Sequence, residues 1–323
     1  MNNKNSTNKN VRASIINTVL IGDVFDKIKE IEDNTVQCIV TSPPYWGLRD
    51  YGNDSQIGLE PTPESFVNNM VKVFREAKRV LKDDGTLWLN LGDSYARTPN
   101  SVDPQGGLCA SKDNDKKYNF AHKKEYGNIK PKDLVGIPWR VALALQADGW
   151  YLRQDIIWHK PNPMPESVKD RCTKAHEYIF LLSKSPHYKY NADAIKTAYK
   201  AGTTGGGQIG GSKGNSKEGL KAKLAKSEQG FFKMAEGSNR RSVWKIPVKP
   251  YAGAHFATFP EKLPELCIKA GSDKGDIVLD VFFGSGTTGW VAQRLSRQWI
   301  GIELNPKFAK IANERFKQQQ LFY

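Results

Sequence analysis

The strongest constraint on the fold lies in the last fifth of the chain, where an apolar segment leads into a glycine-rich turn. Residues 276–283 are typical of a buried strand that carries Asp280, and the turn at 284–289 contains three glycines. A helical pattern follows over 290–295, and a further apolar strand ends at Glu303. Strand, glycine-rich turn, helix and strand in this order predict an α/β fold with a doubly wound, mostly parallel sheet.

The same corner of the sheet has the chemistry to bind a ligand. Glycine has no Cβ, so the backbone at Gly284 and Gly286 can approach a ligand closely. A carboxylate at the end of the next strand can accept hydrogen bonds from both hydroxyls of a ribose. Because Glu303 stands at that place, the turn and the acid together indicate a nucleotide-binding corner more strongly than the turn alone.

The tetrapeptide Ser42-Pro43-Pro44-Tyr45 is a second informative feature. Residues 38–41 are small, β-branched or apolar, so they predict a short buried strand that the two prolines end. The Ser42 hydroxyl and the proline carbonyls are hydrogen-bond acceptors, and Tyr45 adds an aromatic face. Fixed acceptors beside a ring suit a planar group with an exocyclic amine, such as a nucleobase. On these four residues alone, an ordinary turn is the alternative.

Together, the tetrapeptide and Phe282-Phe283-Gly284-Ser285-Gly286 resemble the S-adenosylmethionine-dependent amino-group DNA methyltransferases. The tetrapeptide precedes the cofactor glycines, as in the permuted beta-type members of that family. Val281 and Phe256 are departures, because the family often has proline at both places, but both replacements are apolar. The resemblance covers most of the chain except the first dozen residues and two polar insertions. Three further segments match the motifs of the family: 22–23, 90–95 and 255–263.

The resemblance implies S-adenosylmethionine as the cofactor and a role for each matching residue. Ser42, Pro43, Pro44 and Tyr45 are expected to be catalytic, orienting the amine for in-line attack. Hydrogen bonds from the amine to the Ser42 hydroxyl and the Pro43 carbonyl favour a pyramidal nitrogen, and Tyr45 stacks on the flipped-out base. The sulfonium donor is already activated, so no metal is expected. The expected cofactor-binding residues are Asp23, Phe259, Asp280, Phe282, Gly284, Gly286 and Glu303.

Ser42 also bears on which base is methylated. In the family, Ser before Pro-Pro goes mostly with cytosine N4, whereas Asp or Asn goes mostly with adenine N6. We therefore expect a site-specific cytosine-N4 methyltransferase acting on duplex DNA, with adenine N6 as the alternative. More distant alternatives are an inactive DNA-binding protein and a methyltransferase acting on RNA or protein. Methylation of a cytosine ring carbon is not expected, because none of the four cysteines follows a proline.

The charge of the chain points to a polyanionic partner. The formal net charge is +14, and such a surplus speeds encounter with DNA. Residues 196–249 hold 12 Lys or Arg and 3 Asp or Glu, a net of +9, with too little apolar content for a core of their own. We expect this segment to be a target-recognition insertion that contacts DNA, and a solvated linker is the alternative. The candidate DNA contacts are Lys160, Phe231, Phe232, Arg240, Arg241 and Trp244.

These features divide the chain into four expected segments: a disordered amino terminus (1–13), a catalytic half (14–195) with a polar loop at 97–130, the basic region (196–249), and a cofactor-binding half (250–323). Periodicity predicts helices at 63–81 and 131–147, and strands at 15–20, 86–91, 150–158 and 176–183. The chain has no CxxC pair, signal peptide or membrane-spanning segment, so a reduced, cytoplasmic protein is expected. The resemblance is compatible with a cognate restriction endonuclease and with a homodimer.

Overall fold

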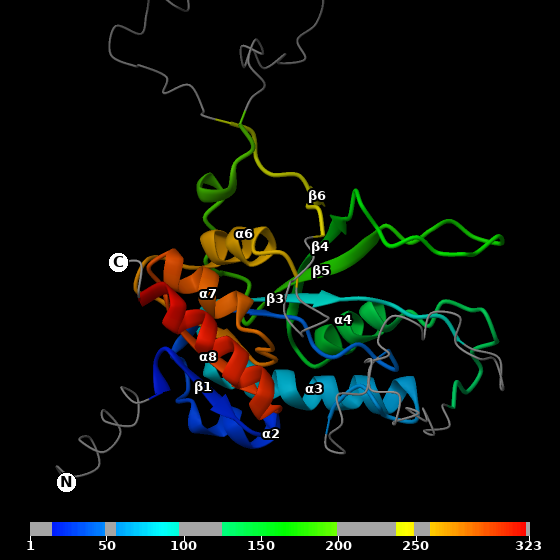
Figure 1. Ribbon diagram of the computed structural model, residues 1–323, viewed down its shortest axis with the longest axis horizontal. Helices are drawn as coiled ribbons and strands as arrows, with labels where there is room; N and C mark the ends of the chain where they lie inside the picture. Colours follow the sequence, from blue (N-terminus) through cyan, green and yellow to red (C-terminus); the bar gives the residue numbers. More distant parts are fainter. Residues whose placement is uncertain (1–14, 49–55, 97–124, 199–236, 249–258, 321–323) are drawn as a thin grey trace, which may run out of the picture. The chain divides into compact units, whose positions relative to one another are not determined.

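The computed structural model describes residues 15–48, 56–96, 125–198, 237–248 and 259–320. These residues belong to two compact units, one drawn from 1–191 and 242–323 and the other from 192–241. The larger unit is built around one sheet (Figure 1). The expected disordered amino terminus lies outside the described residues, as do most of the polar loop and most of the basic region.

The sheet has eight strands in the order β1-β8-β7-β2-β3-β5-β4-β6. Strand β5 is antiparallel to both of its neighbours, β3 and β4, and every other neighbouring pair is parallel. The sheet is therefore mostly parallel, as the sequence predicts. The strands are β1 (Thr18–Ile21), β2 (Val36–Thr41), β3 (Leu81–Leu91), β4 (Tyr151–His159), β5 (His176–Ser183), β6 (Val243–Lys245), β7 (Ile277–Asp280) and β8 (Gln298–Glu303).

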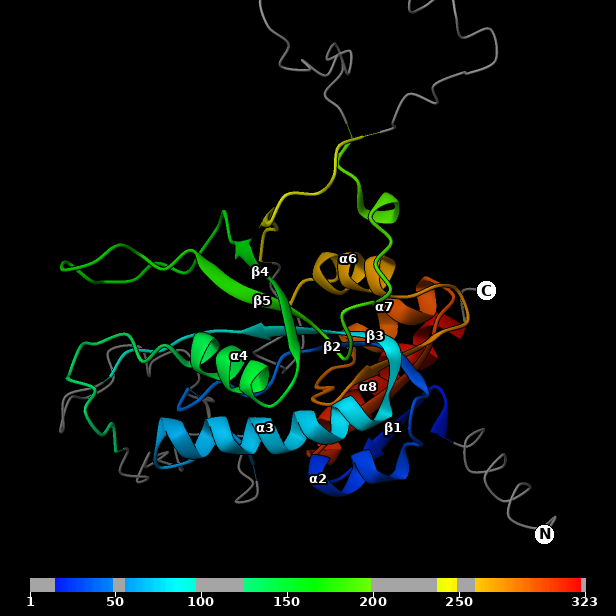
Figure 2. The ribbon, with the colours of Figure 1, turned by 180° about the vertical axis from the view of Figure 1, so that it is seen from behind.

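Helices cover both faces of the sheet (Figures 1 and 2). Helices α3 and α4 pack against each other, and α7 packs against both α6 and α8. The right-handed sense of parallel crossovers places the helix after β2 and the helix after β7 on opposite faces, because the two connections run in opposite directions along the sheet. The helices are α2 (Val24–Lys27), α3 (Pro63–Val80), α4 (Ile137–Ala147), α6 (Lys262–Gly271), α7 (Thr287–Arg294) and α8 (Pro306–Gln320), and a 3₁₀ turn covers Ile28–Glu30.

The central strand and the longest helix follow directly from the sequence. All six residues of β2 are buried, because the strand lies between β7 and β3 and both its faces are covered. Helix α3 begins where Thr62 caps it by accepting a hydrogen bond from the Ser65 amide at 3.1 Å, with Pro63 in the first turn. Its buried side chains recur at helical spacing and face the core: Phe66, Met70, Val73, Phe74, Ala77 and Val80.

Two element boundaries differ from the prediction. Helix α4 begins at Ile137 rather than at 131, because Gly136 takes a left-handed conformation with φ 78° just before it. The Asp93 carboxylate accepts hydrogen bonds from the amides of Gly136 and Ile137 there. Strand β3 begins at Leu81 rather than at 86, since the chain pairs with Val36 before an irregularity and rejoins β2 at Thr86.

The basic region also differs in part from the prediction. Residues 243–245 within it form β6, which pairs with β4 in the sheet of the larger unit. The described part of the smaller unit holds a 3₁₀ turn, Asp193–Ile195, and an antiparallel bridge in which the amides and carbonyls of Thr197 and Ser238 exchange two hydrogen bonds of 2.9 Å.

None of the described helices is long and apolar enough to span a lipid bilayer.

Candidate active site

The chain reverses its winding direction between β7 and β2. From β2 it passes through α3 to β3 on one side, and from β7 it passes through α7 to β8 on the other. In open α/β sheets, ligands bind at such a switch point, beyond the carboxyl ends of the strands. The Ser42–Tyr45 tetrapeptide follows β2, and the glycine-rich turn follows β7. The two sequence features, far apart along the chain, therefore lie at adjacent strand ends.

A buried carboxylate ties these two strand ends together. Asp280, which is 2% exposed, accepts hydrogen bonds of 2.7 Å from the hydroxyls of Thr41 and Thr288. It also accepts one from the Phe282 amide at 3.1 Å. Burial raises the pKa of Asp280 to about 6, and the three donors only partly oppose that rise. Because Thr41 directly precedes Ser42, this carboxylate fixes the tetrapeptide relative to the glycine-rich turn.

Glu303 closes the other side of the turn. It ends β8 and is 8% exposed, and its carboxylate accepts hydrogen bonds from the amides of Gly284 at 2.7 Å and Asn305 at 2.8 Å. Burial raises the pKa of this carboxyl group. The Gly22 amide donates to the Glu303 carbonyl at 2.9 Å, and Asp23 then caps α2 by accepting from the Phe25 amide at 2.8 Å. Asp23, Glu303 and Gly284, which are among the expected cofactor-binding residues, thus lie together.

The conformation of the turn requires its glycines. Gly284 and Gly286 have φ values of 54° and 78°, in the left-handed region that side chains disfavour. The Phe283 ring is buried over Gly301, where an added Cβ would lie 2.4 Å from the ring. Between the two glycines, the buried Ser285 hydroxyl has no hydrogen-bond partner among the described residues. An unsatisfied buried hydroxyl in a tight turn fits a site that completes its hydrogen bonds with a ligand.

Tyr45 is held by groups from β3 and β5. Its hydroxyl donates to the Glu177 carboxylate at 2.6 Å and lies 3.4 Å from the Asn90 side-chain oxygen. Its ring lies over Gly92, where a Cβ would be 2.4 Å from Cε2 of the ring. Ser42, by contrast, is half-buried, and no described residue forms a hydrogen bond with its hydroxyl. The site therefore combines a fixed ring with an available hydroxyl.

The contact at Gly92 leads to a testable expectation. Replacing Gly92 with alanine is expected to lower methyl transfer at least tenfold, because the new methyl group would displace the Tyr45 ring. The backbone of Gly92 is not in the left-handed region, so the steric contact is the cause. Single-turnover rates of G92A, Y45A and the double variant measure this effect. If G92A lowers the rate by the same factor in the wild-type and Y45A backgrounds, the steric contact with the Tyr45 ring is not the cause.

The structure corrects one predicted DNA contact and revises two others. Trp244 is 3% exposed on β6, with its ring 6.2 Å from that of Trp88, so it packs in the core and cannot reach a DNA groove. Lys160 forms an ion pair with Glu177. Arg240 donates to the Ile195 carbonyl at 2.8 Å. Arg241 is exposed.

The four other aromatic residues predicted for the site or for DNA contacts fall into two groups. Phe259 and Phe282 are partly exposed, and Phe282 packs against the main hydrophobic core from the carboxyl edge of β7. Phe231 and Phe232 lie outside the described residues.

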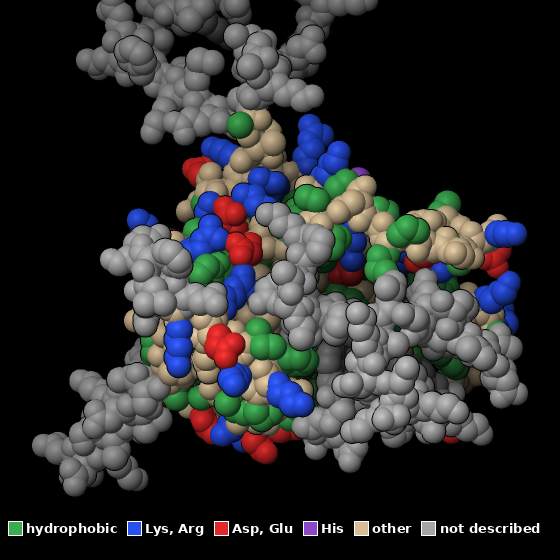
Figure 3. Space-filling model, in the orientation of Figure 1, with side chains coloured by type: hydrophobic (Ala, Val, Ile, Leu, Met, Phe, Trp, Pro, Cys, Tyr) green, Lys and Arg blue, Asp and Glu red, His purple; other side chains and the backbone are tan. Residues whose placement is uncertain are grey.

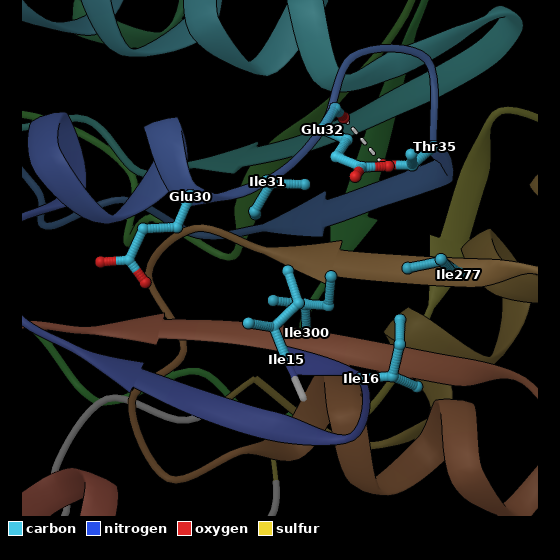
Figure 4. Close-up of a pocket in the computed structure, with 8 residues that line it drawn as sticks. All are labelled: Ile15, Ile16, Glu30, Ile31, Glu32, Thr35, Ile277 and Ile300. Atoms are coloured by element: carbon cyan, nitrogen blue, oxygen red, sulfur yellow. Dashed lines mark hydrogen bonds between the residues drawn. The ribbon is translucent and has the colours of Figure 1, made fainter. Parts of the chain in front are cut away.

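A small depression lies away from this site (Figure 4). It is lined by Ile15, Ile31, Ile277 and Ile300 among others, and the Thr35 hydroxyl donates to the Glu32 carbonyl at its rim. Ile277 begins β7 and Thr35 precedes β2, so the depression is at the amino ends of the strands. Its volume of about 10 Å³ would hold at most one water. It is a packing defect rather than a ligand site.

Charged side chains of both signs are interspersed on the face shown in Figure 3. Among the described residues, Arg294 and Arg315 both form ion pairs with Glu261. Among the described residues no group of His, Cys, Asp or Glu could hold a metal ion.

Comparison with known proteins decides the family. A family model described as DNA methylase matches residues 36–314. This chain belongs to the DNA methylase family. The model is that of the N6/N4 methyltransferases, which use S-adenosylmethionine. The resemblance expected from the tetrapeptide and the glycine-rich turn is thereby confirmed.

Curated relatives of this DNA methylase align along nearly the whole chain. It is 46% identical over 306 residues to the Type II methyltransferase M.Cfr9I of Citrobacter freundii, covering 93% of this chain and 87% of that protein. It is 44% identical over 307 residues to the Type II methyltransferase M.SmaI of Serratia marcescens, covering 94% and 91%. This DNA methylase is therefore a DNA methyltransferase similar to those of Type II systems.

Solved structures share its fold. The PvuII DNA methyltransferase (cytosine-N4-specific) matches with a TM-score of 0.61 at 20% identity, covering 92% of this chain and 85% of that one. A DNA modification methylase of Thermus thermophilus, solved in complex with S-adenosyl-L-methionine, matches with a TM-score of 0.57 at 24% identity, covering 93% of each chain. These likenesses confirm the predicted Rossmann-like methyltransferase fold.

Proposed function

We propose that this DNA methylase transfers a methyl group to the exocyclic N4 amine of a cytosine flipped out of duplex DNA. The observation that carries the proposal is the Ser42 hydroxyl, which stands at the switch point, half-buried and without a hydrogen bond from any described residue. The fold shared with a methyltransferase described as cytosine-N4-specific supports the same assignment. The proposal makes Ser42 the acceptor for an amine hydrogen.

The residues around the glycine-rich turn fit S-adenosylmethionine. Glu303 is a nearly buried carboxylate that can accept two hydroxyl donors, and the unsatisfied Ser285 hydroxyl lies in the adjacent turn. We assign the ribose to Glu303, the close backbone approach to Gly284 and Gly286, and the adenine end to Asp23 and Phe282. When bound, the cofactor supplies a methyl group on a sulfonium, which is an activated donor.

Asp280 has a supporting part in this proposal. Its carboxylate oxygens already accept hydrogen bonds from Thr41, Thr288 and the Phe282 amide. Because the side chain is also almost fully buried, we assign it to holding the two loops in register rather than to contacting the ligand. This revises the expectation that placed Asp280 among the cofactor contacts.

The tetrapeptide residues act on the base. An aromatic amine is a weak nucleophile, because its lone pair is delocalised into the ring. The Ser42 hydroxyl and the Pro43 carbonyl accept the two amine hydrogens and favour a pyramidal nitrogen, which frees the lone pair for in-line attack. The Tyr45 ring stacks on the base, which returns roughly 1–3 kcal/mol of the few kcal/mol that flipping costs.

The decisive experiment is transfer of a labelled methyl group to unmethylated duplex DNA and, in parallel, to RNA, followed by nucleoside analysis. N4-methylcytosine is the expected product. N6-methyladenine would keep the family and cofactor but reject the cytosine assignment. Label in RNA alone, or no label at all, would reject the proposed function. A cognate restriction endonuclease is part of the proposal, because the relatives are named as Type II enzymes. Its test is whether methylated DNA resists that nuclease.

Replacing Glu303 with alanine is expected to weaken binding of S-adenosylmethionine by about tenfold to a hundredfold. Hydrogen bonds to a charged acceptor contribute roughly 1.5–3 kcal/mol, and every 1.4 kcal/mol is about a factor of ten. Isothermal titration measures the change, with Glu261→Ala as a control on a partly exposed glutamate that is paired with Arg294 and Arg315. An unchanged affinity in the Glu303 variant would contradict the assignment.

A further inference from the structure

We propose that Glu177 is a positioning residue of this enzyme, which holds the Tyr45 ring in the orientation that a flipped base needs. The inference rests on the proposed function, since it concerns how the base is received. Neither a motif nor the neighbourhood of the tetrapeptide points to Glu177, which is 132 residues from Tyr45 in the sequence.

The topology of the sheet brings Glu177 to the site. Strand β5 runs antiparallel to β3, so its amino end lies at the edge where β2 and β3 have their carboxyl ends. Glu177 is the second residue of β5, and Asn90 is the next-to-last residue of β3. The end of β4, where Lys160 follows, meets the start of β5 at the same edge. The ends of β3, β4 and β5 therefore place Asn90, Lys160 and Glu177 close together at this edge of the sheet.

The contacts of Glu177 form one connected network. One carboxylate oxygen accepts from the Tyr45 hydroxyl at 2.6 Å and from the Asn90 amide at 3.1 Å. The other oxygen is paired with the Lys160 ammonium group. The side chains of Glu177 and Lys160 are 13% and 20% exposed. A mostly buried carboxylate requires such a compensating charge, which explains why Lys160 is turned inward here instead of toward phosphate.

The network restricts Tyr45 at both ends of its side chain. The prolines fix the backbone before it, and the hydrogen bond to Glu177 fixes the far end of the ring. Gly92 limits the position of the ring, since an added Cβ there would lie 2.4 Å from Cε2 of the ring. A ring held in this way loses little conformational freedom when a base stacks on it, and pre-organisation of that kind improves binding without new contacts.

Lys160 is itself held in place by an aromatic ring. Its ammonium group lies 4.5 Å from the centre of the Trp158 ring, within cation–π range. Trp158 is buried and donates through its ring N–H to the Ile246 carbonyl at 2.8 Å. The ion pair therefore packs on a buried, hydrogen-bonded ring at the end of β4. Its burial separates the arrangement from a surface ion pair, which contributes little.

The test is a double-mutant cycle between Glu177 and Tyr45. Glu177→Ala is expected to lower kcat roughly tenfold to a hundredfold, with the KM for S-adenosylmethionine within about twofold of wild type. Glu177→Gln keeps an oxygen that can accept from Tyr45, so it should restore most of the rate. In the Tyr45→Phe background, Glu177→Ala should have little further effect. Multiplicative losses in the double variant would overturn the proposal.

A matched control and a structural readout complete the experiment. Glu166 is also an ion-paired glutamate, 17% exposed and bound to Arg171, but it does not contact Tyr45. With tyrosine labelled by ¹³C, the ring signal that disappears in Tyr45→Phe should shift in Glu177→Ala and stay in place in Glu166→Ala. An unshifted signal in Glu177→Ala would overturn the inference, whichever base is methylated.

The two proposals fail in different ways. Absence of methyl transfer by the wild-type protein would reject the proposed function, whereas the ring signal would still report whether Glu177 holds Tyr45. Should Glu177→Ala fail to fold, the cycle between Glu177→Gln and Tyr45→Phe serves in its place. In that cycle, Glu177→Gln would refute the positioning role if it lowered the rate more than about tenfold and the loss persisted in the Tyr45→Phe background.

Discussion

Replacing Ser42 with alanine should lower the rate of methyl transfer by roughly a hundredfold, the loss typical of removing one pre-organised hydrogen-bonding group from an active site. The hydroxyl forms no hydrogen bond with a described residue, so its removal leaves no buried group unsatisfied. Stability and cofactor affinity should therefore stay close to those of the wild-type enzyme. The structure thus predicts a loss confined to the chemical step.

Single-turnover kinetics with saturating cofactor and DNA measure this effect. Ser65→Ala is a suitable control, because Ser65 is a half-buried serine at the start of α3 whose hydroxyl contacts the Thr62 hydroxyl and not the tetrapeptide. Its substitution should leave the rate unchanged within about twofold. A Ser42 variant whose rate matches the control would exclude the hydroxyl as an acceptor for the amine, and the Pro43 carbonyl alone would then have to orient it.

The second large effect is expected at Asp280. Replacing it with alanine removes the acceptor for the Thr41 and Thr288 hydroxyls and the Phe282 amide. Each orphaned donor costs about 1–3 kcal/mol, while relief of the buried charge offsets part of the sum. We expect a net destabilisation on the order of 2 kcal/mol at pH 7. Asp280→Asn keeps an acceptor and loses the charge, so it should be as stable as the wild type or more stable.

The raised pKa of Asp280 also predicts how the stability of the protein depends on pH. The pKa of the folded state, about 6, lies above the ordinary 3.8, so between these values the folded protein binds more protons than the unfolded chain. The contribution of this group to stability is therefore complete below about pH 4, falls as pH rises to about 6, and is level above that. Urea unfolding at several pH values should show this fall in wild type and a flatter profile in Asp280→Asn. Parallel profiles would contradict it.

Local sequence patterns sufficed to predict most of the fold. Strand β2, helix α3 and strand β8 follow from apolar runs and periodicity, and the tetrapeptide and Glu303 stand out because they follow such runs directly. The parallel character of the sheet could also be predicted, since strands alternate with helices. In these cases the deciding interactions lie within a few residues of each other along the chain.

The rest could not be predicted, because it depends on which strands become neighbours. Trp244 lies in a basic, glycine-rich context that indicates exposure, yet pairing of β6 with β4 buries it. Glu177 begins an ordinary strand, and only antiparallel pairing with β3 brings it to Tyr45. The start of α4 could not be predicted for a related reason. Asp93, which follows β3, accepts hydrogen bonds from the Gly136 and Ile137 amides and so fixes where the helix begins.

The pairing of β2 with β7 has a consequence for how such an enzyme can diversify. The active site is closed by neighbouring strands and by the Asp280 carboxylate, so the length of chain between the two halves does not set its geometry. Each doubling of an intervening flexible loop costs only about 0.6 kcal/mol. The length of the stretch between β5 and β6 can therefore change without moving these two strand ends. The fold thus tolerates a change of length in this segment without altering the two strand ends that form the site.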